Sequence, residues 1–175
     1  MAVEIERKYL VRNDGWRTSS TGIRYRQGYL STQPGRSVRV RVGAGRGFLT
    51  IKGLIVNATR SEYEYPIPVE DANELLNTLC LRPIIEKTRY SIAHEGLLWE
   101  IDEFEGVNAG LILAEVELAE PDQQIRLPDW VGEEVTDDPR YYNACLIANP
   151  FTKWSDRSSG YCHGFPDGGH PRTGP

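Results

Sequence analysis

The sequence predicts a mainly β fold with a few flanking helices (α+β), built as an eight-stranded antiparallel closed β-barrel. Alternation of charged and apolar residues with a period of two recurs in eight segments between Val3 and Leu118, and this period is typical of strands. Turn-forming residues and short gaps separate most neighbouring segments, which favours antiparallel hairpins. Eight antiparallel strands are enough to close into a barrel.

The expected strands follow one another along the chain, and two helices interrupt or follow them. The strands are 3–11, 22–29, 37–42, 48–53, 60–67, 85–92, 97–104 and 111–118. A capping box that begins at Asp71 starts the first helix, which ends before Pro83. The second helix starts at Asp138, where a proline follows the N-cap residue, and runs through Ile147. We expect both helices to cover an end or a flank of the sheet.

The chain of 175 residues forms one domain with a tail. Residues 155–175 contain no Ile, Leu, Val, Met or Ala but have five Gly and three Pro. A segment of this composition buries too little apolar area to offset its ordering entropy. We therefore predict a folded domain over 1–154 and a disordered C-terminal tail over 155–175.

Composition and charge exclude several classes of partner. The chain has 20 Lys+Arg against 25 Asp+Glu, a net charge of −5, so it lacks the basic surplus typical of nucleic-acid binding. Its apolar runs are far shorter than the roughly 20 residues that a membrane helix needs. The N-terminus is charged where a signal peptide is apolar. These features predict a cytoplasmic protein without a nucleic-acid or membrane partner.

Charged residues occupy one face of every expected strand. On a single strand the ordinary interpretation is a solvated outer face. Here, however, the charges come as same-sign pairs at i, i+2, and such pairs repel each other unless a ligand compensates them. We therefore expect the charged faces to point into the barrel, where they would gather eight acidic and eight basic side chains: Glu4, Glu6, Glu62, Glu64, Glu100, Asp102, Glu115, Glu117, and Lys8, Arg24, Arg26, Arg39, Arg41, Lys52, Lys87, Arg89.

The two signs of charge suggest what such an interior binds. Burying this many dry charges would cost several kcal/mol per ion, so the interior must be open to water. Clustered carboxylates without His or Cys suit Mg²⁺ or Mn²⁺. Guanidinium and ammonium groups suit phosphate oxygens. Together they predict a small-molecule polyphosphate held with its metal, and phosphoryl transfer as the chemistry.

An ordered set of motifs resembles a known family. Glu4-Ile5-Glu6-Arg7-Lys8 resembles the ExExK signature of the CYTH superfamily, the triphosphate tunnel metalloenzymes. The likeness runs from about residue 3 to residue 150 and is to the short bacterial, tripolyphosphatase-like members. Further matching segments follow in the family's order: 26–30, 38–41, 50–52, 62–64, 86–90, 100–102, 115–117 and 134–143.

The resemblance implies site residues, position by position. The metal-side carboxylates would be Glu4, Glu6, Glu62, Glu64, Asp102, Glu115 and Glu117. The phosphate-binding cations would be Lys8, Arg26, Arg39, Arg41, Lys52, Lys87 and Arg89. The catalytic group would comprise Lys87, Glu4, Glu6 and Tyr29. Lys87 is the candidate for proton transfer, since neighbouring cations such as Arg89 would lower its pKa. A role for Lys87 as a plain phosphate clamp is left open.

The family resemblance implies a divalent-metal-dependent triphosphatase, an enzyme acting on acid anhydrides. The favoured activity is that of an inorganic tripolyphosphatase, which releases the terminal phosphate of tripolyphosphate by metal-activated water. The alternatives are a class IV-type adenylate cyclase, or a thiamine or nucleoside triphosphatase that accepts ATP. A non-enzymatic sheet that binds single-stranded RNA is a further hypothesis, but the carboxylates would repel RNA. A homodimer through the tyrosine-rich exterior is also left open.

Overall fold

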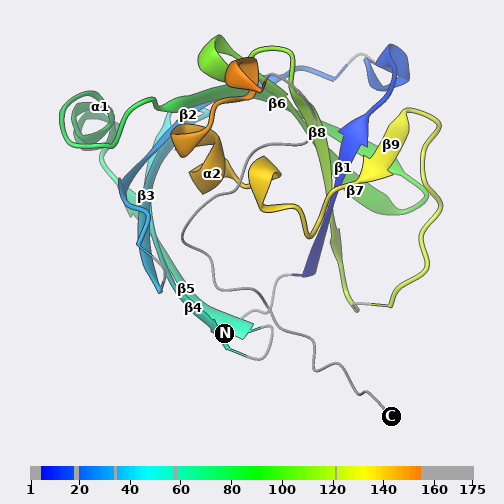
Figure 1. Cartoon of the computed structure of the whole chain (residues 1–175), viewed down its shortest axis with the longest axis horizontal. Coiled ribbons are helices and arrows are strands. Elements are labelled where there is room, and N and C mark those ends of the chain that lie inside the picture. Colours follow the sequence, from blue (N-terminus) through cyan, green and yellow to red (C-terminus); the bar gives the residue numbers. More distant parts are fainter. Residues whose placement is uncertain (1–4, 18–19, 34, 57–58, 121, 155–175) are drawn as a thin grey trace.

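The computed structural model describes residues 5–17, 20–33, 35–56, 59–120 and 122–154. These residues form one curved antiparallel sheet of nine strands in the order β5-β4-β3-β2-β6-β7-β8-β1-β9, which bends around a central space (Figure 1). The predicted tail, 155–175, lies outside the described residues. No helix of the described part is long and apolar enough to cross a membrane.

All eight expected strands are confirmed, with ends that differ by a few residues. They are β1 (Ile5–Val11), β2 (Ile23–Ser31), β3 (Arg36–Gly43), β4 (Arg46–Val56), β5 (Thr59–Ile67), β6 (Ile85–His94), β7 (Leu97–Phe104) and β8 (Ile112–Leu118). A ninth strand, β9 (Val131–Glu134), was not predicted. Its four residues are too few to show an alternation.

The prediction of a closed eight-stranded barrel is wrong, because the sheet of the described residues is open and has nine strands. β9 pairs with the free edge of β1, placing Val131 opposite Val11 and Glu134 opposite Tyr9. That edge is therefore partly occupied, and β5 ends the sheet on the far side with β4 as its neighbour. The strands surround the central space without joining into a ring.

Helix α1 (Val69–Thr78) covers the convex face of β2, β3 and β4, outside the curve of the sheet (Figure 1). Ala72 and Leu76 are fully buried there with Val40 of β3. The helix begins two residues before the predicted start, with Pro68 as its N-cap and Asp71 in its first turn. The predicted capping role of Asp71 is therefore wrong.

A second apolar cluster fills the convex face of the other half of the sheet. Tyr9 of β1 packs there with Trp99 of β7, at 5.7 Å between ring centroids. Trp130, just before β9, meets Trp99 edge-on at 5.5 Å. Aromatic burial on this scale stabilises the convex side, so the apolar residues of these strands face outward, as the alternation predicted.

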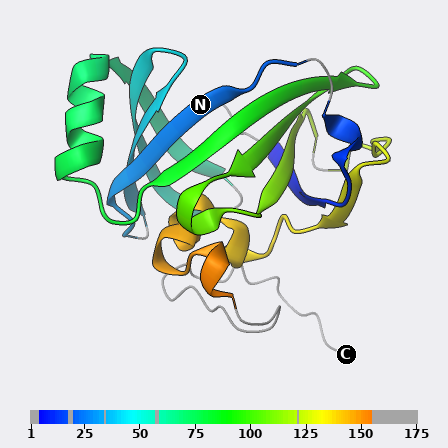
Figure 2. The ribbon, with the colours of Figure 1, turned by 90° about the horizontal axis from the view of Figure 1, so that it is seen from above.

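Helix α2 (Asn143–Ala148) lies inside the curve of the sheet (Figure 1). Before it comes a short 3-10 turn, Pro139–Tyr141, whose N-cap Asp138 accepts a hydrogen bond from the Arg140 backbone. The predicted cap is thus confirmed, but it starts this turn rather than the helix. Figure 2 shows the C-terminal turns gathered on one side of the strands.

The C-terminal segment makes an apolar floor across one end of the concave face. Leu146 of α2 is fully buried in a cluster formed with residues at matching ends of five elements: Tyr29, Ile85, Phe104, Leu113 and Tyr141. Because these side chains come from the end of β2, the start of β6, the end of β7 and the start of β8, they close the same end of the central space. The charged residues lie farther along the same strands. The concave face is therefore a cup with an apolar floor.

Candidate active site in the concave face

The first wall of the cup is formed by β1, β8, β7 and β6. Antiparallel pairing places Lys8 opposite Glu115, and Arg89 opposite Asp102. Glu100 also lies opposite Glu115 across β7 and β8. Because paired residues point to the same side of a sheet, these acids and bases share the concave face. The alternation of charged and apolar residues in the sequence had predicted this placement for all five.

Ion pairs join the residues of this wall into one network. Lys8 Nζ lies 2.8 Å from Glu115 Oε1, and Arg89 Nη2 lies 3.0 Å from the other oxygen of Glu115. Arg89 also donates to both oxygens of Asp102 at 2.7 Å. Lys87 donates to the same carboxylate, which has no exposed surface, and Arg89 also pairs with Glu100. The network fixes two cations, Lys87 and Arg89, at the base of the wall.

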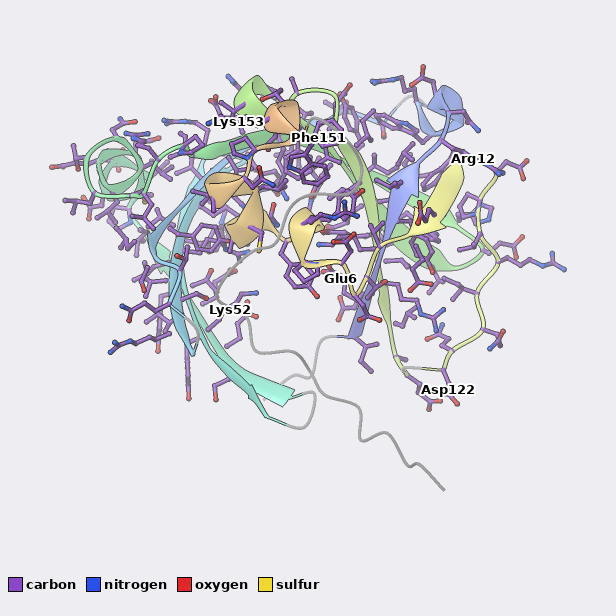
Figure 3. All side chains as sticks on the ribbon, in the orientation of Figure 1. Glu6, Arg12, Lys52, Asp122, Phe151 and Lys153 are labelled. Atoms are coloured by element: carbon purple, nitrogen blue, oxygen red, sulfur yellow. The ribbon has the colours of Figure 1, made fainter. Side chains whose placement is uncertain are left out.

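The second wall is formed by β3, β4 and β5. Arg41 Nη2 lies 3.2 Å from Glu64, and Lys52 Nζ lies 2.9 Å from Glu62. Buried Thr50 donates to Glu64 at 2.9 Å and accepts from Arg39 at 3.2 Å. Figure 3 shows Lys52 and Glu6 directed inward from opposite sides of the cup. The two walls therefore present cations toward a shared space.

Strand β2 lies between the two walls and contributes Tyr25, Gln27 and Tyr29 to the concave face. Tyr25 is opposite Lys87 on one side and Gly43 on the other. The guanidinium carbons of Arg41 and Arg89 lie 5.7 Å and 6.0 Å from the centroid of its ring. Tyr25 is therefore a concave residue and not part of the tyrosine-rich exterior that the sequence suggested. Its ring lies close to arginines of both walls.

Arg26 does not join the concave site, and neither does Arg24. Arg26 is opposite Glu86 on the convex side, and it donates to Asn73 and Asn77 of α1 at 3.1 Å and 2.9 Å. Arg24 pairs with Glu86 and Glu105 on the same convex side. Their predicted inward placement is wrong, because β2 turns its odd-numbered residues inward.

Tyr29 is buried at the floor of the cup. It lies opposite Arg39 of β3 and packs in the apolar floor cluster. Its side chain is therefore on the concave face. Its catalytic role stays a prediction.

Burial and neighbouring charges change several pKa values in the cup. Burial lowers the pKa of Lys87, although Asp102 works in the opposite direction. Burial, helped by the charge of Arg39, lowers the pKa of Arg41. Burial alone would raise the pKa of Glu115, but neighbouring cations, Lys8 foremost, lower it to about 2. The charged forms of Lys87 and Arg41 are therefore destabilised by their surroundings, and a bound anion would relieve this.

The carboxylates are divided between the walls. Glu62 and Glu64 belong to β5, whereas Glu6, Glu115 and Glu117 belong to the β1–β8 pair. Glu4 lies outside the described residues. Within the described ranges no three acidic, His or Cys side chains form a ready-made metal cluster.

The β1–β8 carboxylates have the chemistry that a hard divalent cation needs. Glu6 and Glu117 are directly opposite each other, and like charges in that position are destabilising. Burial and the charge of Glu115 raise the pKa of Glu6, so a cation among these oxygens would relieve a repulsion that the protein alone retains. The residues present therefore fit a site for a hard divalent cation.

Three concave residues were missed by the sequence analysis, namely Tyr25, Gln27 and Thr50. A signal for two of them was present in the chain. Tyr29 and Arg26 differ by three positions, so a regular strand cannot turn both inward. The structure shows which face is inward: Gly28 lies on the same face as Arg26, and a side chain there would collide with Cys80 and Leu76. Thr50, by contrast, looks like an ordinary strand threonine.

The fold and the site define a class of protein: a curved antiparallel sheet whose concave face gathers cations and carboxylates. The CYTH domain family model matches residues 2–142, and this chain belongs to the CYTH domain family. An inorganic triphosphatase of Acetivibrio thermocellus is 47% identical over 156 residues, covering 89% of this chain and 100% of the relative.

Two further relatives agree with this assignment. An inorganic triphosphatase of Nitrosomonas europaea is 41% identical over 153 residues, covering 82% of this chain and 95% of the relative. A crystal structure of an inorganic triphosphatase superposes with a TM-score of 0.65 at 38% identity, covering 84% of this chain and 95% of that one. These likenesses therefore cover more than four-fifths of this chain.

Proposed function

We propose that this chain is an inorganic triphosphatase, a hydrolase that cleaves the terminal anhydride bond of tripolyphosphate. Relatives of that name at 47% and 41% identity support the proposal. The observation that carries it is the convergence of cations from both walls on one cup: Lys8, Arg39, Arg41, Lys52, Lys87 and Arg89. Their number and placement suit a compact polyanion.

The inward cations would orient the substrate along the cup. Arg39 and Arg41 on β3 face Lys87 and Arg89 on β6, with β2 between the two strands. A linear triphosphate between them would exchange protein carboxylates for phosphate oxygens as partners of these cations. Positioning and charge stabilisation supply most of the catalysis in phosphoryl transfer.

A divalent cation is the proposed cofactor, either Mg²⁺ or Mn²⁺. Glu6, Glu115 and Glu117 would hold it, together with Glu4. Such an ion, when bound, neutralises phosphate charge and makes a nearby water more acidic. Glu62 and Glu64 on β5 offer oxygens on the opposite wall.

Lys87 is the residue that we propose to hold or move a proton at its Nζ atom. It is 3% exposed, and its pKa is lowered by burial. An ammonium with a lowered pKa releases its proton more readily than a surface lysine does, and it also stabilises a leaving phosphate oxygen. Asp102 holds Lys87 in place through its fully buried carboxylate.

The proposal is tested by phosphate release from tripolyphosphate, ATP and thiamine triphosphate, each with Mg²⁺, with Mn²⁺ and with EDTA. We expect tripolyphosphate to be hydrolysed fastest and the reaction to stop in EDTA. A parallel assay for cyclic AMP separates hydrolase from cyclase. Cyclic AMP as the main product from ATP, or no turnover of any triphosphate with either metal, would refute the proposal.

A further inference from the structure

Three unsatisfied hydrogen-bond donors lie together on the concave faces of β2 and β3. In the described part of the chain, the buried side-chain nitrogens without a partner include Gln27 Nε2, Arg39 Nε and Arg41 Nε. Gln27 lies directly opposite Arg41, and Arg39 follows two residues away on the same face. Buried polar groups are nearly always hydrogen-bonded, so each exception needs an explanation. Three neighbouring donors call for a ligand rich in acceptor oxygens.

Gln27 differs from the two arginines in what else it contacts. Arg39 and Arg41 bond through their terminal nitrogens to Thr50 and Glu64. The amide nitrogen of Gln27 is buried without a partner, in a residue that is 1% exposed. Leaving such a group unsatisfied destabilises the fold, and an apolar side chain of similar length would avoid this cost. The position therefore has a polar residue that the fold does not require.

The place of Gln27 in the cup indicates which groups a ligand there would meet. Its neighbour on β6 is Ile85, a member of the apolar floor. Two residues farther along the same face is Tyr29, also in the floor. In the other direction along β2 comes Tyr25, which is opposite Lys87. Gln27 thus lies where the apolar floor meets the charged residues, directly opposite Arg41.

We propose that Gln27 binds a phosphate group of the substrate, its amide NH₂ donating to a phosphate oxygen beside Arg39 and Arg41. The inference rests on the proposed triphosphatase function and adds a neutral donor to its set of cations. A neutral donor holds this phosphate group without adding a like charge to the crowded arginines. Gln27 is therefore a substrate-binding residue.

Two substitutions and a control test the role of Gln27. Gln27→Met keeps the length of the side chain and removes the donor, whereas Gln27→Glu keeps the shape and replaces the donor with a carboxylate. The control is Gln124→Met, at an exposed position between β8 and β9. Each variant is measured for kcat/KM with tripolyphosphate and metal. Each is also measured for the rise in Tm that tripolyphosphate causes in EDTA.

We expect Gln27→Met to keep or raise the Tm of the free protein, while its kcat/KM falls roughly tenfold to a hundredfold, the range for a lost hydrogen bond to a charged group. Gln27→Glu should lose more than Gln27→Met, and both should show a smaller Tm rise with tripolyphosphate. Gln124→Met should match the wild type in both measurements.

The outcomes separate this inference from the function on which it rests. If the wild type hydrolyses tripolyphosphate and either Gln27 variant keeps its kcat/KM within twofold, the role of Gln27 is refuted and the function stands. If the wild type lacks turnover but tripolyphosphate raises its Tm, the function fails, and the Tm rise of the Gln27 variants decides the binding role. If tripolyphosphate neither turns over nor changes the Tm, both are refuted.

Discussion

Thr50 connects an arginine and a carboxylate of the same wall, and it does so from a fully buried position. Its hydroxyl donates to Glu64 and accepts from Arg39. Thr50→Val keeps the shape of the side chain but removes both hydrogen bonds. We expect kcat/KM for tripolyphosphate to fall about tenfold, because Arg39 loses one of its fixed contacts. The free energy of unfolding, measured in urea, should fall by about 1–2 kcal/mol.

The matched control for Thr50→Val is Thr88→Val on the convex face. Thr88 donates to Glu105 at 3.0 Å, so the same substitution there removes a similar hydrogen bond outside the cup. Equal kcat/KM values for the two variants would contradict the positioning role of Thr50.

The pKa of Glu115 predicts how the stability of the metal-free protein depends on pH. Because the folded value is about 2 and the ordinary value is 4.5, the unfolded state binds more protons between them. This contribution is present above pH 4.5 and is lost as pH falls toward 2, amounting to roughly 3 kcal/mol. The pKa of Glu6 is raised in the folded protein, so the contribution of Glu6 to stability has the opposite pH dependence. It is present at low pH and is lost as pH rises through the folded pKa.

Urea unfolding of the metal-free protein between about pH 2 and pH 5 measures the Glu115 contribution. Glu115→Gln should flatten the rise in unfolding free energy across this window, because the titrating group that Lys8, Lys87 and Arg89 hold ionised is then absent. An unchanged slope in Glu115→Gln would show that other groups set the acid stability.

At the scale of elements, β2 shows what the sequence could and could not predict. The positions of the strands followed from alternation, because period two is imposed by the backbone itself. Which face points inward was predicted for seven strands but not for β2, where both faces carry large polar side chains. The deciding contact is Gly28 against Leu76 of α1 and Cys80 just after the helix, and this contact depends on where a distant helix packs.

Helix α2 closes the floor, and its central side chain tests that role. Leu146 is fully buried among residues of β2, β6, β7 and β8. Leu146→Ala should lower the free energy of unfolding by about 2–5 kcal/mol, because it leaves a cavity where four strands meet. The measurement is urea unfolding. The control is Leu98→Ala, at a position that is 56% exposed. If Leu146→Ala lowered the free energy of unfolding no more than Leu98→Ala does, the role of Leu146 in the apolar floor would be contradicted.

The complete sheet is a cup and not the predicted ring, but both shapes turn the charged faces of the strands toward one another. The inward charges need a curved sheet with water access, and the open sheet provides both. The sequence could not predict that the sheet stays open. Strand β9 is too short to show an alternating pattern, and it pairs with the edge of β1 that a closed barrel would need. The charged set itself was predictable, because same-sign pairs at i, i+2 recur on most strands.

In the proposed function the concave face binds and cleaves the triphosphate, and a pair of arginine variants separates this face from the rest of the sheet. Arg41 lies in the cup, whereas Arg26 lies outside it against α1. Measured side by side with tripolyphosphate and Mg²⁺ or Mn²⁺, Arg41→Ala should lose at least a hundredfold in kcat/KM, as expected when a charged contact is removed. Arg26→Ala should stay within about twofold of the wild type, since surface substitutions away from a site have small effects. Full activity in Arg41→Ala, or an equal loss in Arg26→Ala, would contradict the claim.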